Sequence, residues 1–124
     1  MFTNRKNLKF LNQLSHPILT RNIINSINRF KNGILVIDAA LLFDWPKVLR
    51  KLDYAILVSS PRILSEKRAG TKGIDKRTFW YIIKIQKKEK VMARHAHYII
   101  KNDGGLKKLK KRCCEVFQEI IDGH

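Results

Sequence analysis

The sequence predicts an α/β fold with a parallel sheet of about three strands. Short apolar runs rich in β-branched residues lie at 33–38, 54–59 and, more weakly, 97–102, and segments of helical periodicity lie between them. The first two runs are too short for helices and are apolar on both faces, which is typical of strands buried inside a parallel sheet. Strands that alternate with helices favour right-handed crossover connections.

Two helices are expected before the first strand. Apolar residues recur at helical spacing over residues 8–14 and again over residues 18–30. The dipeptide His16-Pro17 stands between these stripes, and the residue before a proline is disfavoured in the α region. The sequence therefore predicts a break there, and Gly33 is expected to help end the second helix.

Four further helices are expected over residues 46–51, 61–68, 75–94 and 106–121. They fall between and after the expected strands, where crossover helices belong. Asp75 follows a Gly-Ile pair at the start of the third of these helices. A carboxylate in this place accepts a backbone N–H of the first turn, so Asp75 is expected to be the N-cap.

The strong positive charge limits the classes of ligand. The chain has 26 Lys and Arg against 10 Asp and Glu, a formal net charge of +16. Such a field attracts nucleotides and nucleic acids alike. The basic residues are spread over the whole length and are not gathered in one arm. This distribution favours a phosphorylated small-molecule ligand, with a basic nucleic-acid-binding module as the alternative.

Membrane and metal roles find little support in the sequence. No apolar run approaches the roughly 18 residues of a bilayer-spanning helix. Cys113 and Cys114 are adjacent, and no Cys/His pattern has the spacing of a zinc site. His95 and His97 lack further ligands nearby. We therefore expect a cytoplasmic protein without a metal site of its own.

The end of the first expected strand carries the most informative motif. Open α/β sheets place function at the carboxyl ends of their strands, and residues 37–45 here read Ile-Asp-Ala-Ala-Leu-Leu-Phe-Asp-Trp. This run resembles the signature of dephospho-coenzyme A kinases, in which a strand ends in Asp, two small or apolar residues, Leu-Leu-Phe and an acid. Other segments are similar to that family in order and spacing: Leu-Ser-His-Pro at 14–17, Ser-Ser-Pro at 59–61, Gln86, and residues 98–102 with Gly104-Gly105. The resemblance covers nearly all 124 residues.

The resemblance implies an incomplete P-loop NTPase-type sheet with flanking helices and a helical lid. Residues 1–31 would be a helical substrate-side segment, 33–60 the core strands, 61–95 the lid, and 97–124 the last strand and C-terminal helix. The implied activity, the last step of coenzyme A biosynthesis, is ATP-dependent phosphorylation of the ribose 3′-hydroxyl of dephospho-coenzyme A. In such kinases Mg²⁺ bridges the phosphates of ATP, and lid cations cover the transferring group.

The same resemblance suggests site residues, each with a purely structural alternative. The substrate-binding candidates are His16, Asp38, Leu41, Phe43 and Asp44. The nucleotide and lid candidates are Lys67, Lys72, Gln86 and Asn102. The acids could instead be turn residues, the apolar candidates core, and Gln86 an exposed helix residue. No residue is assigned as catalytic.

Two departures from the family pattern bear on activity. No G-x-x-x-x-G-K-[ST] phosphate-binding loop occurs in these 124 residues. Lid positions that carry arginine in the family hold Lys67, Thr71 and Ile82 here, although Arg68, Lys72 or Arg77 could substitute. We therefore expect no turnover by this chain alone. A separate chain with the P-loop half is one possible partner, and an inactive structural remnant is the remaining alternative.

Overall fold

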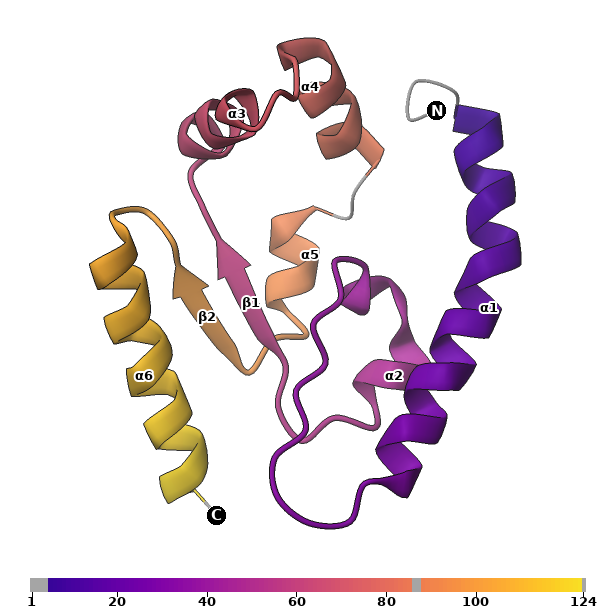
Figure 1. The fold of residues 1–124 in the computed structure, drawn as a ribbon, viewed down its shortest axis with the longest axis vertical. Helices are drawn as coiled ribbons and strands as arrows, with labels where there is room; N and C mark the ends of the chain where they lie inside the picture. The colour runs from indigo at the N-terminus through magenta and orange to yellow at the C-terminus, as the bar shows by residue number, and fades with distance from the viewer. Residues whose placement is uncertain (1–4, 86–87, 124) are drawn as a thin grey trace. The chain divides into compact units, whose positions relative to one another are not determined.

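The computed structural model describes residues 5–85 and 88–123, without the side chains of residues 5–10, 12 and 85. The chain divides into two compact units, Met1–Asp53 and Tyr54–His124, which we call unit 1 and unit 2. Helices and strands occur in the described part, and the α/β class predicted from the sequence is confirmed (Figure 1).

One long helix begins unit 1. Helix α1 runs unbroken over Arg5–Arg29 with Pro17 inside it, so the predicted break at His16-Pro17 is wrong. Proline removes one donor from the helical ladder and normally kinks or breaks a helix interior. Ile23, Ile24 and Ile27, which follow the proline, pack against the core of unit 1. This packing outweighs the local preference of the residue before proline.

The core of unit 1 is a small cluster of buried side chains against which α1 packs. After α1, the chain forms the 3-10 helix η1 (Leu42–Asp44) and the short helix α2 (Pro46–Leu49). Leu42, Trp45 and Val48 form the buried cluster, and Val48 has no exposed surface. Pro46 stands in the first turn of α2, where its missing N–H has no helical partner to lose.

The expected strand at 33–38 does not form. Residues 34–38 have no regular secondary structure and belong to neither strand of the described sheet, and Val36 is 77% exposed. Gly33, with φ of +98°, turns the chain into this segment. A strand requires a hydrogen-bonded neighbour, and the described residues of the chain provide none for this run. The apolar, strand-like run at 34–38 therefore has no paired strand among the described residues.

Unit 2 is built on two parallel strands. Strand β1 (Ile56–Ser59) pairs with β2 (Tyr98–Lys101) in the register Ile56 to Tyr98 through Ser59 to Lys101. The two other predicted strands are thus confirmed, and they are direct neighbours. The helices of this unit are α3 (Arg62–Thr71), α4 (Lys76–Ile85), α5 (Glu89–Ala93) and α6 (Leu106–Asp122).

The single helix expected over residues 75–94 is two helices. Helix α4 ends at Ile85 and α5 begins at Glu89, while Lys88 before it has an extended backbone, with φ −62° and ψ 140°. Lys84 and Lys88 would be like charges four residues apart on a continuous helix, which is destabilising. No Gly or Pro marks this interruption in the sequence.

Reciprocal hydrogen bonds fasten the start of the strand pair. The backbone N–H of His97 donates to the carbonyl of Ala55 at 2.8 Å, and the N–H of Ala55 donates to Nδ1 of His97 at 2.9 Å. At the other end, the N–H of Asn102 donates to the carbonyl of Ser59 at 2.6 Å. His97 thus satisfies a backbone donor of a buried residue and fixes the register of the sheet.

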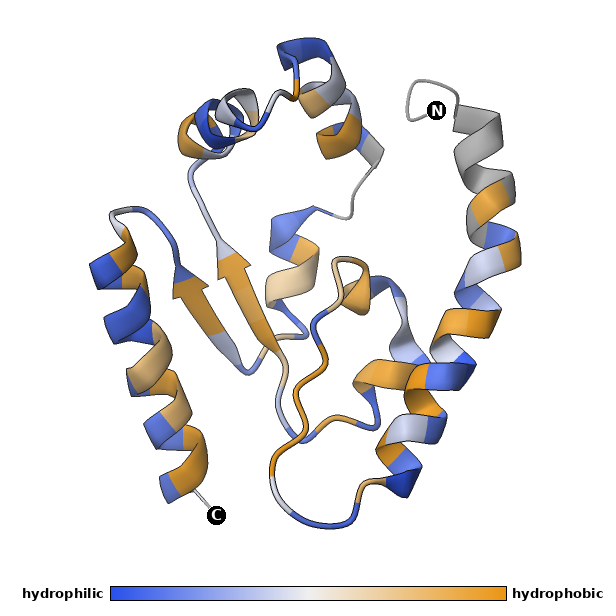
Figure 2. Ribbon diagram, viewed as in Figure 1, coloured by the Kyte–Doolittle hydropathy of each residue, from blue (hydrophilic) through white to orange (hydrophobic). Residues whose placement is uncertain are grey.

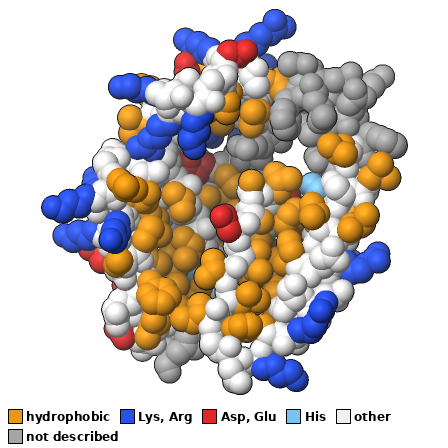
Figure 3. All heavy atoms as spheres, in the orientation of Figure 1, with side chains coloured by type: hydrophobic (Ala, Val, Ile, Leu, Met, Phe, Trp, Pro, Cys, Tyr) orange, Lys and Arg blue, Asp and Glu red, His pale blue; other side chains and the backbone are white. Residues whose placement is uncertain are grey.

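Each face of this sheet is only partly covered. Helix α6 packs beside β2 and α5 against β1, and Ile100 and Leu57 are buried. On the same strands Val58 is 54% and Ile99 41% exposed. Figure 2 shows both strands and one side of α6 as hydrophobic, and Figure 3 shows hydrophobic side chains open to solvent over this part of unit 2. Parallel strands are normally covered on both faces, so this exposure is unusual.

The outer edge of β1 is the second open feature. The carbonyls of Ala55 and Ser59 accept bonds from the β2 side. Because backbone groups alternate in direction along a strand, the N–H and C=O groups of Ile56 and Val58 face the opposite edge. No other strand lies along that edge in the described residues of unit 2.

Asp75 confirms the predicted N-cap of α4 and gives a pH-dependent prediction. Its Oδ1 accepts the backbone N–H of Thr78 at 2.7 Å, and this bond holds the pKa of the Asp75 carboxyl below its ordinary value of 3.8. The contribution of the cap to stability is therefore complete above that ordinary value and is lost as the pH falls through the lowered pKa.

We expect an NMR titration to show the Asp75 carboxyl and the Thr78 amide shifting together, with a midpoint below 3.8. Asp75→Asn is the matched control, because asparagine caps helices as well but does not ionise in this range. The Thr78 amide should keep its shift at all acidic pH values in that variant. An unchanged titration of Thr78 in Asp75→Asn would contradict the assignment.

Candidate functional site

A polar cavity lies at the carboxyl ends of both strands of unit 2. It has a volume of about 410 Å³, within the usual range for small-ligand sites. Its lining comes from the loop after β1, the end of β2 and the first turn of α5: Ser59, Ser60, Pro61, Arg62, Glu89, Lys101 and Asp103. Open parallel sheets bind ligands at this edge. The cavity is thus the best-placed candidate site in the described part of unit 2.

Arg68 of α3 connects the two loops that border this cavity. Its Nη1 donates to the carbonyl of Asn102 at 3.0 Å and to Oγ of Ser60 at 3.4 Å. Its Nη2 donates to the carbonyl of Gly104 at 3.2 Å. Side chain and acceptors are partly buried. The guanidinium group therefore joins α3 to the segment between β2 and α6.

A salt bridge sets the charge at the rim of the cavity. Lys108 Nζ lies 2.9 Å from Oδ1 of Asp103. The hydrogen bond and charge of Lys108 hold the pKa of the Asp103 carboxyl below its ordinary value. Asp103 is thus ionised and paired with Lys108. The other charged residues of the lining are the cations Arg62 and Lys101 and the carboxylate Glu89. Such a mixed lining suits a polar ligand with more than one functional group.

The substrate-side candidates all lie in unit 1, in two different environments. The His16 ring is half-buried and stands edge-on to Trp45, with centroids 5.6 Å apart. Leu41 packs against the core cluster and Phe43 is buried. Asp38 and Asp44 are exposed at the two ends of the motif. The two acids are therefore the members of this set that a ligand can reach from solvent.

Two ring nitrogens in this region have no hydrogen-bond partner among the described atoms: His16 Nε2 and Trp45 Nε1. Both are buried, and their rings contact each other. An unpaired buried polar atom costs free energy unless water or a ligand satisfies it. These two nitrogens are therefore the polar atoms in this region that a ligand or water could satisfy.

The nucleotide and lid candidates are not gathered in one place. Lys67 on α3 and Lys72 at its end are exposed and do not line the cavity. Asn102 is half-buried and contributes its backbone, which bonds Ser59 and Arg68. Gln86 lies outside the described residues.

Sequence reasoning gave no role in the site to Glu89 or Arg62, and it considered Arg68 only as a substitute for a missing lid arginine, not as a residue that binds backbone. Arg68 is adjacent to Lys67, and consecutive residues on a helix point about 100° apart. The exposed Lys67 and the inward Arg68 therefore have different surroundings. The sequence shows an arginine at position 68, but it does not show whether that side chain binds backbone carbonyls or phosphate.

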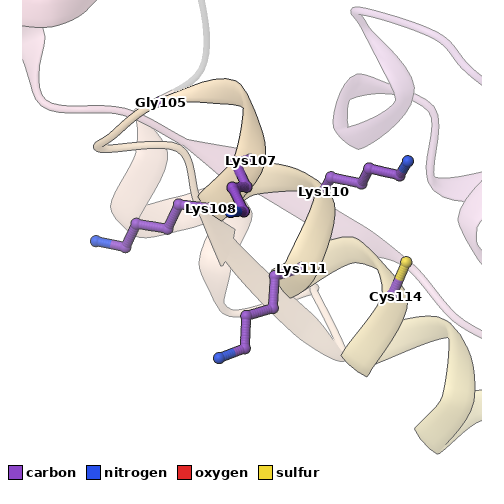
Figure 4. Close-up of a pocket in the computed structure, with 6 residues that line it drawn as sticks. All are labelled: Gly105, Lys107, Lys108, Lys110, Lys111 and Cys114. Carbon is purple, nitrogen blue, oxygen red and sulfur yellow. The ribbon is translucent and has the colours of Figure 1, made fainter.

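A second hollow lies along the start of α6. Its volume is about 760 Å³, and its lining is Gly105, Lys107, Lys108, Lys110, Lys111 and Cys114. Figure 4 shows that the lysine side chains diverge, with Lys108 and Lys110 pointing in opposite directions. Divergent ammonium groups form a solvated basic surface. They do not converge on one point where an anion could bind, so this surface does not specifically support the nucleic-acid-binding alternative.

Residues 5–85 and 88–123 contain neither a candidate metal centre nor a candidate membrane span. No three His, Cys, Asp or Glu side chains there lie close enough to hold a metal ion. None of the helices in those ranges has the length and apolar character needed to cross a membrane.

Comparison with known proteins gives a consistent result. A family model described as dephospho-CoA kinase matches residues 1–108. The dephospho-CoA kinase of Chlorobaculum tepidum is 30% identical over 124 residues, which cover 98% of this chain and 59% of that protein. Those of Chlorobium luteolum and Lactobacillus johnsonii are 28% and 26% identical, with 98% and 97% of this chain and 57% and 62% of theirs covered. The chain therefore spans about three-fifths of the length of these relatives.

Proposed function

The chain belongs to the dephospho-CoA kinase family, and on this premise we propose that it provides the acceptor-side and lid segments of such a kinase. The reaction would transfer the γ-phosphoryl group of ATP to the ribose 3′-hydroxyl of dephospho-CoA, in the cytoplasm. The observation that carries the proposal is the polar cavity at the carboxyl ends of β1 and β2, in the part of the fold where α/β kinases bind nucleotides.

The proposal divides the roles between the two units. In unit 1, Asp38 and Asp44 would contact the acceptor's polar groups, with Asp38 orienting the ribose hydroxyl or accepting its proton. His16, Leu41 and Phe43 would form the wall behind them. In unit 2, Lys67 and Lys72 would approach the phosphates from the lid, and Asn102 would border the nucleotide through its backbone.

ATP and Mg²⁺ need groups that the described part of this chain does not bring together. Mg²⁺ binds through one or two carboxylates together with substrate phosphates, and the described residues contain no cluster of candidate ligands. The ion would offset charge between the phosphates. The phosphate-binding loop, absent from these 124 residues, would come from a complementary segment, on the same polypeptide or on a second one.

The open edge of β1 supports a need for such a segment. The backbone groups of Ile56 and Val58 face away from β2, and Val58 and the unpaired run at 34–36 expose apolar side chains. A strand added along this edge would pair those backbone groups of β1. The length of the curated relatives that this chain does not cover is sufficient to supply it.

An activity assay tests the proposal. The purified chain with ATP, Mg²⁺ and dephospho-CoA is expected to give no turnover, because positioning and charge neutralisation at the phosphates are missing. Adding the segment of the Chlorobaculum tepidum kinase that this chain does not match, in trans or fused through a flexible linker, is expected to give turnover.

Asp38→Asn in the fused protein is the informative variant, with an expected loss of about 10²–10⁴ in kcat if the carboxylate acts as base. Asp53→Asn, an exposed acid outside the motif, is the matched control and should keep full activity. Turnover by the isolated chain would refute the need for a complementary segment. An inactive fusion that folds would refute the kinase assignment.

A further inference from the structure

Among the described residues of α3, α4 and α5, Arg68 is the one cation whose side chain binds two separate loops at the cavity. We infer that Arg68 is a positioning residue that shapes the nucleotide cavity through the backbone of residues 102–104 and does not bind phosphate. The inference rests on the proposed function for the identity of the ligand. Its structural basis, three hydrogen bonds of 3.0–3.4 Å from one side chain, is independent of that function.

The acceptors explain why this position needs an arginine. The carbonyls of Asn102 and Gly104 are two residues apart on the segment between β2 and α6, and each takes one arm of the guanidinium group. A planar fork with fixed donors can bond both at once, whereas a lysine ammonium is a single point donor on a flexible stem. Partly buried carbonyls without donors are costly, so Arg68 holds this segment in one shape.

That segment forms one wall of the cavity. Lys101 and Asp103, on either side of Asn102, both line it, and Ser60, the third acceptor of Arg68, lines it from the loop after β1. One side chain thus sets the distance between the two loops. A shift of the lid helix α3 would reach the cavity wall through Arg68.

The same bonds remove Arg68 from phosphate binding. Three of the five N–H donors of the guanidinium group are engaged by backbone and hydroxyl oxygens, so a phosphate would find only the Nε–H and one Nη2–H unless the side chain released the loop. The neighbouring Lys67 is exposed and free to take that part. Loss of Arg68 should therefore weaken binding of the whole nucleotide, whatever its number of phosphates.

Calorimetric titration of the full chain with adenosine, ADP and ATP tests this division. Arg68→Lys and Arg68→Ala are expected to lower the affinities for adenosine and for ATP by the same factor. The loss of charge-assisted bonds should make that factor roughly tenfold or more. Lys67→Gln is the matched control and should lower the affinity for ATP more than the affinity for adenosine. Methylguanidinium at millimolar concentration should restore affinity to Arg68→Ala, a rescue that a merely unfolded variant would not show.

The opposite pattern overturns the inference. If Arg68→Lys leaves adenosine binding unchanged and weakens ATP in proportion to its phosphates, Arg68 is a phosphate ligand. If the wild-type chain binds none of the three nucleotides, the proposed nucleotide site is refuted, and backbone amide exchange decides the positioning role alone. Exchange at Asp103, Gly104 and Gly105 must then accelerate in Arg68→Ala while α6 stays protected, and unchanged exchange rejects the role.

Discussion

Replacing Trp45 by alanine is expected to lower the free energy of unfolding of unit 1 by about 3–5 kcal/mol. Trp45 is 7% exposed and forms the buried cluster with Leu42 and Val48. Because whole domains are stable by only about 5–15 kcal/mol, this loss should remove a large share of the stability of unit 1. Urea denaturation followed by far-UV circular dichroism would detect it as a lower midpoint and a loss of α1 signal.

Trp80→Ala is the matched control. Trp80 is 41% exposed, and its Nε1 donates to Glu66 at 2.9 Å on the surface, so its removal should cost under about 1 kcal/mol. Trp45→Phe should fall between the two, because it keeps most of the ring and removes an N–H that has no partner. Equal midpoints for Trp45→Ala and Trp80→Ala would show that the cluster does not hold unit 1 together.

Proline substitutions at two adjacent residues of β1 should have opposite consequences. The N–H of Val58 faces the open edge, whereas that of Leu57 faces β2. Val58→Pro should leave the strand pair formed but weaken association with the complementary segment by about five- to 150-fold, the equivalent of one lost buried backbone bond. Leu57→Pro should disrupt the strand pair itself, at a cost of about 3 kcal/mol or more.

Association is measured by titrating the complementary segment against each variant, and the strand pair by the amide exchange of Ile100 and Asn102. Ile63→Lys is the control for surface hydrophobicity, since Ile63 is 83% exposed on α3, away from the edge. It should bind as the unsubstituted chain does. Wild-type association by Val58→Pro would mean that the complementary segment docks elsewhere.

Much of the fold could be predicted from local pattern, and the failures have a common cause. The β-branched runs at 54–59 and 97–102 form strands, as expected, because each finds the other as a neighbour. The run at 33–38 has the same composition but no partner, so it is not a strand. Pairing is a property of two segments, and a single run cannot reveal whether the second is present. Pro17 illustrates the same limit, because tertiary packing overrode a strong local signal.

The candidate site was less predictable than the fold. Family resemblance pointed to side chains such as Lys67 and Asp38, and the described structure leaves both exposed. The groups that shape the cavity are mainly backbone carbonyls and the side chain that binds them, Arg68. Carbonyl groups occur at every residue, so the sequence gives no sign of which ones a side chain will meet. Glu89 lines the cavity as the first residue of α5.

The parallel pairing of β1 and β2 also has a kinetic consequence. All of α3, α4 and α5 lie between the two strands in the chain, so the ladder forms only after a long loop has closed. The free-energy cost of closing a loop rises only slowly with its length, by about 0.6 kcal/mol per doubling. Contacts between segments distant in the chain nevertheless slow folding strongly. We expect the helices of unit 2 to form early and the strand pair late. Until the His97–Ala55 bonds close, both strand edges are exposed to other chains at the same time, so newly synthesised protein would be most prone to aggregate during this interval.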